Sequence, residues 1–127
     1  MINPNNQFVE TALSQYVETA LWSSLVWHED QEPTPMDDSY DASDIASETL
    51  AQMRETVSDF VAANADTIAA AGLNAEAVGH DLWLTQNSHG AGFWDRGLGV
   101  FGDTLTEAAK AEGSVDLYPG DDGKLYI

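Results

Sequence analysis

The fold class is decided by the stretch Val115-Asp116-Leu117-Tyr118-Pro119-Gly120-Asp121-Asp122-Gly123-Lys124-Leu125-Tyr126-Ile127. Two runs with aliphatic and aromatic residues flank a turn rich in Gly and Asp. The Asp-Gly pair supplies the positive φ angles that a tight hairpin turn needs. We therefore predict an antiparallel β-hairpin here, which separates an α+β fold from an all-α fold.

Helical periodicity dominates the chain before this hairpin. Apolar residues recur at steps of three and four, the spacing of an amphipathic helix. This spacing predicts helices over Gln7 to Trp27, from Ser43 or Asp44 to about Ala63, over Asp66 to Ala71 with a stop at Gly72, and over Asp103 to Glu112 with a stop at Gly113.

Bulky and β-branched residues between Asp81 and Thr85 predict one further short strand. The expected fold is α+β, with N-terminal helices packed on a small C-terminal antiparallel sheet that ends in a β-hairpin. A chain of 127 residues with 43% hydrophobic content fits one domain over 1–127. Between the first two helices, residues 28–43 combine many acids with Pro33 and Pro35, which predicts a mobile acidic loop.

Charge is the most unusual property of the composition. Asp and Glu number 22 against 4 Lys and Arg, which gives a formal net charge of −18. Such a field repels nucleic acid and anionic membranes, so we expect no direct binding to either. Three explanations remain open: ordinary solubility, adaptation to a salt-rich (halophilic) cytoplasm, and an acidic surface that competes with DNA or RNA for a basic groove.

Several site classes are excluded by what the sequence lacks. There is no cysteine, so disulfides, thiolate metal sites and thiol nucleophiles are ruled out together. No run approaches the roughly 20 apolar residues of a membrane span, and the first residues lack the order of a secretory signal. We therefore expect a cytoplasmic protein that needs no cofactor.

An acidic stripe on the second predicted helix is the sharpest candidate for a binding site. At about 100° per residue, its members fall within an arc of roughly 60° opposite the apolar face. Carboxylates one turn apart are separated by about 6 Å along the axis, similar to phosphates along a strand. The predicted binding residues are Asp44, Glu48, Glu55, Asp59 and, on the first helix, Trp22, which falls off the main apolar arc.

The glycine-rich segment from Asn87 to Gly97 allows three interpretations. In the first, His89 is a general base oriented by Asp95, Arg96 holds an anion, and a ligand binds at the turn formed by Asn87, His89, Gly90 and Gly92. In the second, a metal is held by His80, Asp81, His89 and Asp95, but their spacing matches no known metal site, so none is expected. In the third, the glycines form turns and the aromatic residues fill the core.

The same segment carries a resemblance. The run Trp83-Leu84-Thr85-Gln86-Asn87-Ser88-His89-Gly90-Ala91-Gly92-Phe93-Trp94-Asp95-Arg96-Gly97 resembles the motif W-L-T-x-N-x-H-G-A-G-F-W-D-R-G of small proteins encoded by tailed phages and prophages. Those proteins usually have a basic residue at the position of Gln86 and Gly at that of Ser88, and they are less acidic. The resemblance implies a phage or viral origin and, if so, residence in the host cytoplasm, but no particular chemistry.

Binding is therefore the function class that the sequence favours over catalysis. The first hypothesis is a phage or viral accessory protein that inhibits a host DNA- or RNA-handling or defence protein by mimicking nucleic acid. The second is a small ligand-binding or hydrolytic domain centred on the turn at His89. The third is a salt-adapted structural or virion-accessory protein, whose acids would be spread evenly over the surface.

Overall fold

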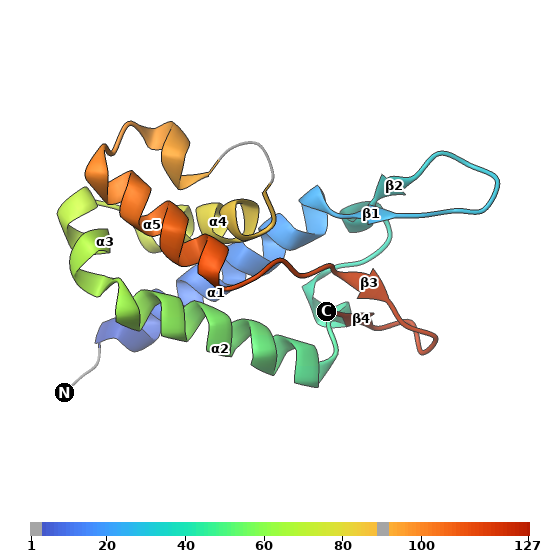
Figure 1. Cartoon of the computed structure of the whole chain (residues 1–127). Coiled ribbons are helices and arrows are strands. Elements are labelled where there is room, and N and C mark those ends of the chain that lie inside the picture. Colours follow the sequence, from blue (N-terminus) through green and yellow to red (C-terminus); the bar gives the residue numbers. More distant parts are fainter. Residues whose placement is uncertain (1–3, 89–91) are drawn as a thin grey trace.

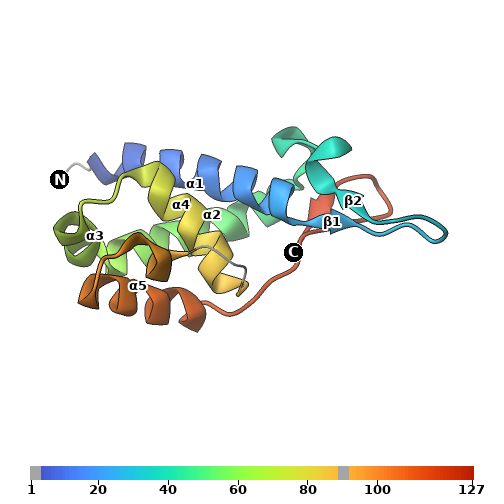
Figure 2. The same ribbon diagram turned by 90° about the horizontal axis from the view of Figure 1, so that it is seen from above.

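The computed structural model describes residues 4–88 and 92–127. Over these ranges the chain is α+β, with five α-helices and a small C-terminal two-stranded antiparallel sheet, as the sequence predicts. The helices gather at one end of the molecule and the hairpins lie at the other (Figure 1, Figure 2). The helices are α1 Pro4–Ser23, α2 Ser47–Ala63, α3 Ala65–Ala71, α4 Ala75–Gln86 and α5 Val100–Ala111.

The predicted strand over Asp81 to Thr85 is wrong, because these residues form the second half of α4. Asn74 caps the helix with its side chain, which accepts a hydrogen bond from Ala77 N at 2.8 Å. From Asp81 to Gln86 every residue is buried, since α4 contacts α1, α5 and the short 3-10 helix η3, Phe93–Arg96. A helix covered on several sides has a continuous apolar run, and such a run resembles a buried strand in the sequence.

The closest helix contact lies between α1 and α4 at Gly79. A Cβ atom at this position would overlap the backbone carbonyl of Ala12 and come within 3.0 Å of Tyr16 N. Two buried aromatic rings also meet at this interface, where Tyr16 and Trp83 pack edge to face with ring centroids 5.3 Å apart. Glycine therefore sets the distance at which the two central helices cross.

The remaining helices complete the core around α4. Their predicted ends are confirmed: Gly72, with φ of 72°, caps α3, and Gly113, with φ of 84°, follows the end of α5. The rings of Phe60 on α2 and Phe93 on η3 stack 5.7 Å apart, with Leu105 of α5 also fully buried. None of the described helices has the length and apolar character needed to cross a bilayer.

The C-terminal hairpin is confirmed, with β3 over Tyr118–Pro119 and β4 over Leu125–Tyr126. Gly123 has φ of 81° in the turn, as the Asp-Gly signal requires. The hairpin docks against the residues before α2, where Ala46 N donates to Leu125 O at 3.0 Å. The two ends of this contact are far apart in the sequence, so the hairpin fixes the start of α2.

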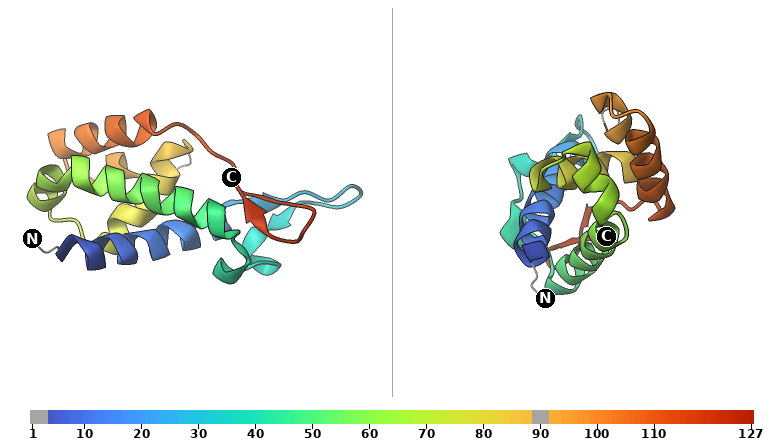
Figure 3. Two further views of the ribbon diagram at one scale, coloured as in Figure 1. Left: turned by 90° about the horizontal axis from the view of Figure 1, so that it is seen from below. Right: turned by 90° about the vertical axis from the view of Figure 1, so that its left-hand side faces the viewer.

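Residues 28–43 contain more regular structure than the predicted acidic loop. The first helix ends at Ser23 and not at Trp27, because the chain turns into strand β1, Leu25–Val26, which pairs with β2, Thr34–Pro35. Two 3-10 helices follow, η1 Met36–Asp38 and η2 Ala42–Asp44, and Met36 is fully buried. The acidic connection between β1 and β2 projects beyond the rest of the fold (Figure 3).

Candidate functional site

Three of the four predicted stripe residues lie on α2 and are exposed. Glu48, Glu55 and Asp59 are spaced so that they share one side of the helix, which we call the α2 acidic face. The opposite side of α2 is buried through Met53, Val57 and Phe60 among others. The helix thus holds three carboxylates in a fixed order along about 16 Å of its axis.

Asp44 does not belong to this face. It lies in η2, before α2 begins, and its carboxylate accepts a hydrogen bond from Asp41 N at 2.9 Å. Asp41 in turn accepts from Ser43 N at 2.9 Å, so the two acids cap the short helix reciprocally. Asp44 is therefore engaged in ordering the entry to α2.

The charges of the α2 acidic face act on ionisable groups of other elements at both of its ends. At the C-terminal end, the pKa of Glu112, beyond α5, is raised by burial and by the nearby charge of Asp59. At the N-terminal end, the hydrogen bond of Tyr126 to Asp122 and, in smaller part, the charge of Glu48 raise the pKa of Tyr126 to about 12. Sequence periodicity could not reveal these neighbours, because Glu112, Asp122 and Tyr126 come from other elements.

Glu112→Gln is expected to stabilise the fold at neutral pH. The pKa of Glu112 is higher in the folded than in the unfolded protein. Its contribution to the free energy of unfolding is therefore most favourable below the unfolded-state pKa and is lost as pH rises through the folded-state pKa. Glutamine removes that loss, so the free energy of unfolding should rise by less than about 0.5 kcal/mol at pH 7 and be unchanged at pH 3. Urea unfolding at both pH values checks this, and the gain should shrink when Asp59→Asn is already present. A loss of stability at pH 7 would contradict the assignment.

Two of the four cations are paired with acids. Arg54 of α2 binds Glu10 of α1, with Nη2 and Oε1 2.9 Å apart. Arg96 of η3 binds the buried carboxylate of Asp81. Of the basic side chains, Lys110 and Lys124 remain, so few positive groups interrupt the acidic surface.

The described part of the glycine-rich segment holds the fold together. Asn87 Oδ1 accepts from Val115 N at 2.8 Å and so ties the end of α4 to the chain after α5. A Cβ atom at Gly92 would overlap Thr85 Oγ1. Ser88 has φ of 58°, in the left-handed region that favours glycine. His89 and Gly90 of the predicted ligand turn lie outside the described residues.

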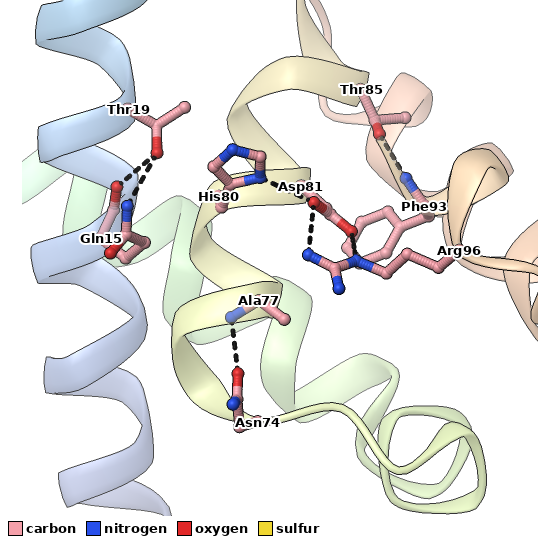
Figure 4. A network of polar contacts seen from close by, with 9 residues as sticks. All are labelled: Gln15, Thr19, Asn74, Ala77, His80, Asp81, Thr85, Phe93 and Arg96. Atoms are coloured by element: carbon pink, nitrogen blue, oxygen red, sulfur yellow. Dashed lines mark hydrogen bonds and ion pairs between the residues drawn. The ribbon is translucent and has the colours of Figure 1, made fainter. Parts of the chain in front are cut away.

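Asp81, His80 and Arg96 form a polar cluster that joins this segment to α4 (Figure 4). The Asp81 carboxylate is 2% exposed and lies 2.8 Å from His80 Nδ1. It also binds Arg96 through Nε and through Nη2, the latter at 3.2 Å, and this contact raises the pKa of Arg96. Arg96 thus pairs with Asp81 and not with its neighbour Asp95, which is exposed.

The contacts of this cluster join η3 to α4. In the interpretation with His89 as general base, the Arg96 guanidinium binds an anionic ligand. In the structure this guanidinium donates hydrogen bonds to Asp81. Trp22, the predicted anchor, is 46% exposed and packs beside His80 with ring centroids 6.0 Å apart. Among residues 4–88 and 92–127, no group of His, Asp and Glu side chains could hold a metal ion.

A cleft of the described structure lies between β1 and the chain leading into β3. Its volume is about 610 Å³, and exposed Leu25, Trp27 and Tyr118 line it. Trp83 and Asn87 form part of its inner wall, with Trp83 Nε1 donating to Ser23 Oγ at 2.9 Å. The two walls of this cleft are separated by more than half of the chain, so sequence patterns alone could not predict it.

The acids as a whole do not define one face. Exposed Asp or Glu residues occur on each of the five helices and in the loops, for example Glu18 on α1, Asp66 on α3 and Asp103 on α5. The chain matches no family model, no curated protein and no solved structure, so similarity to known proteins favours none of the candidate functions. What distinguishes the α2 acidic face is that one helix holds its three carboxylates on one side. The charge of Glu48 also acts on Tyr126, whose ring centroid lies 6.1 Å from that of Tyr118 in the cleft wall.

Proposed function

We propose that this chain is a phage- or virus-encoded protein that binds a basic host protein and occupies the groove where that protein binds nucleic acid. The observation that carries the proposal is the α2 acidic face, a row of three exposed carboxylates that one helix holds on the same side. Within this row Glu55 and Asp59 are one helical turn apart, about 6 Å along the axis, which is similar to the spacing of phosphates along a strand, and Glu48 lies two turns before Glu55. The proposal also places the protein in the host cytoplasm.

Physical chemistry gives this binding mode a characteristic salt dependence. A basic groove releases anions, and the acidic face releases cations, when the two surfaces meet. Affinity should therefore fall steeply with salt, as it does for protein–DNA complexes. The net charge of −18 would also attract a basic partner and so speed association at low salt.

Capture from a bacterial lysate tests the proposal. The protein is immobilised, loaded at about 50 mM salt and eluted by raising the salt to about 200 mM, the range over which nucleic-acid contacts weaken strongly. We expect retained proteins that duplex DNA displaces competitively at constant salt. Retained proteins that resist both salt and DNA would exclude nucleic-acid mimicry.

Reversing the α2 acidic face should weaken the captured complex by at least about tenfold, or about 1.4 kcal/mol. The variant is Glu48→Lys, Glu55→Lys and Asp59→Lys together. Its matched control is Asp66→Lys, Glu76→Lys and Asp103→Lys, which places the same charge change on exposed positions of α3, α4 and α5. Titration of the partner onto each variant compares them. Equal affinities of the two variants would show that overall charge and not the α2 face drives binding.

A salt-adapted protein without a specific acidic site is the second candidate, and the exposed acids on all five helices favour it. Self-repulsion among these carboxylates destabilises the compact state at low ionic strength, and salt relieves it. If this second candidate is right, the protein should unfold in dilute buffer and should capture no partner from the lysate. Thermal melts from low to molar salt, combined with the capture experiment, separate the two candidates.

A further inference from the structure

We propose that the cleft between β1 and residues 114–119 binds an extended segment of the basic partner as an added β-strand. This inference rests on the proposed function and names a second contact for the same partner. The occupant is a peptide segment in which Lys or Arg alternates with aliphatic residues. Aliphatic side chains would lie against Leu25, Trp27 and Tyr118, and the basic ones would face the adjacent acids.

One edge of the β1 backbone has no partner among residues 4–88 and 92–127. Met36 N donates to Ser24 O at 2.9 Å, and the register pairs Leu25 with Pro35. Hydrogen-bonded and non-hydrogen-bonded pairs alternate along an antiparallel ladder, so the N–H and C=O groups of Leu25 point away from β2. Pro35, opposite Leu25, has no N–H to offer. An unpaired edge of this kind is the template for strand addition.

The free edge faces the cleft. The cleft is lined by Ser23 to Trp27 on one side and by Ser114 to Pro119 on the other. Strand β2 lies on the opposite side of β1 (Figure 1). On the far wall, Asp116 and Leu117 make no backbone hydrogen bond to another element in the part of the chain that the structure describes. A strand inserted here has backbone groups available on both sides.

The walls are fixed before any peptide arrives. Asn87 Oδ1 accepts from Val115 N at 2.8 Å, and Gln86 Nε2 donates to Gly113 O at 2.8 Å. Ser23 is held by Trp83 Nε1 at 2.9 Å. A preformed cleft avoids the entropy cost of ordering its walls on binding.

Aromatic exposure and charge select the occupant. Trp27 is 75% exposed and Tyr118 is 50% exposed, which is unusual for large apolar side chains on a fold with an intact core. Asp116 lies in the cleft wall, and Glu29 and Asp30 follow Trp27 in the projecting connection. Basic side chains would thus meet carboxylates, and Arg could also stack on the aromatic faces.

Synthetic peptides test the inference directly. The probe is a nine-residue peptide in which Arg alternates with Val, and its binding is followed by NMR titration of the intact protein at low salt. Two control peptides have the same charge: in one Ser replaces Val, and in the other alternate backbone nitrogens are methylated on the edge that would face β1. We expect both controls to bind at least about tenfold more weakly, since one lacks the apolar anchors and the other lacks the donors.

Protein variants locate the contact. Trp27→Ala is expected to lower the affinity for the probe peptide by about tenfold. Trp94→Ala, at another exposed tryptophan outside the cleft, should change this affinity by less than about twofold. Equal binding of the methylated peptide, or of the Trp27→Ala variant, would overturn the strand-addition proposal. Concentration-dependent dimerisation that Trp27→Ala abolishes would assign the cleft to a second copy of this chain, and would overturn it too.

The two proposals fail separately. If the α2-reversed variant loses the captured partner while Trp27→Ala retains it with unchanged affinity, the α2 acidic face is the binding site and the cleft has no part in it. If the probe peptide binds in the cleft but the α2-reversed variant keeps the captured partner, the cleft proposal survives without the mimicry proposal.

Discussion

Gly79→Ala is expected to lower the free energy of unfolding by about 2 kcal/mol, the upper end of the cost of overpacking less the gain in helix propensity. A Cβ atom here would overlap the Ala12 carbonyl and crowd Tyr16 N, and both are backbone atoms of α1. Backbone cannot move aside as a flexible side chain can, so α1 and α4 would have to separate along their shared interface. Overpacking of this kind costs about 1–3 kcal/mol or more and exceeds the gain of about 1 kcal/mol in helix propensity.

Thermal unfolding followed by circular dichroism measures this effect, and the midpoint should fall by roughly 7 °C. Gly102→Ala on α5 is the matched control. Its Cβ would lie 3.2 Å from Phe93 O and 3.3 Å from Leu98 Cβ, a tight but adjustable fit. We expect the control to stay within about 1 kcal/mol of the wild type, because helix propensity offsets the crowding. A Gly79→Ala variant as stable as Gly102→Ala would show that α1 and α4 do not cross as closely as described.

Asp81→Ala is expected to cost about 2–3 kcal/mol. The carboxylate is 2% exposed, accepts from Arg96, and lies 2.8 Å from His80 Nδ1. Hydrogen bonds to charged groups contribute about 1.5–3 kcal/mol, so their loss at a buried site is large. The cost stays below the 3–5 kcal/mol or so of a fully buried pair, because Arg96 is 38% exposed and water can hydrate it after the change.

Glu10→Ala provides the comparison for this second prediction. It breaks the Arg54–Glu10 pair, whose side chains are 47% and 52% exposed. Exposed pairs contribute about 0–1 kcal/mol, so urea unfolding should separate the two variants clearly. If both variants lost the same stability, the Asp81 cluster would not be what holds η3 on α4.

The sequence predicts most of the fold because its strongest signals are local. The Asp-Gly turn near the C-terminus fixes the hairpin, and Gly72 and Gly113 mark helix ends through their left-handed conformation. The strand predicted over Asp81 to Thr85 fails for a non-local reason, since α4 is buried on several sides only after α1, α5 and η3 pack around it. The helical periodicity of the sequence also continues past Ser23, where α1 ends, because periodicity does not reveal that Leu25 pairs with Pro35.

For the candidate sites too, the sequence predicts what is local and misses what depends on packing. Helical spacing alone places Glu48, Glu55 and Asp59 on one face, and the structure keeps them there. Spacing cannot place Glu112 beside Asp59, nor bring Tyr118 across from Trp27, because these neighbours depend on how separate elements pack. A helix start at Ser43 or Asp44 places Asp44 on the stripe, but α2 begins at Ser47, three or four residues later. The capping contact of Asp44 with Asp41 explains the difference.

The salt dependence of binding tests the α2 acidic face most directly. For the protein captured from the lysate, Kd is measured from about 50 to 200 mM salt for the wild type and for the variant reversed at Glu48, Glu55 and Asp59. We predict a steep rise of log Kd with log salt for the wild type and a clearly shallower rise for the variant, because fewer ions are released. Parallel lines for the two proteins would contradict a binding role for this face.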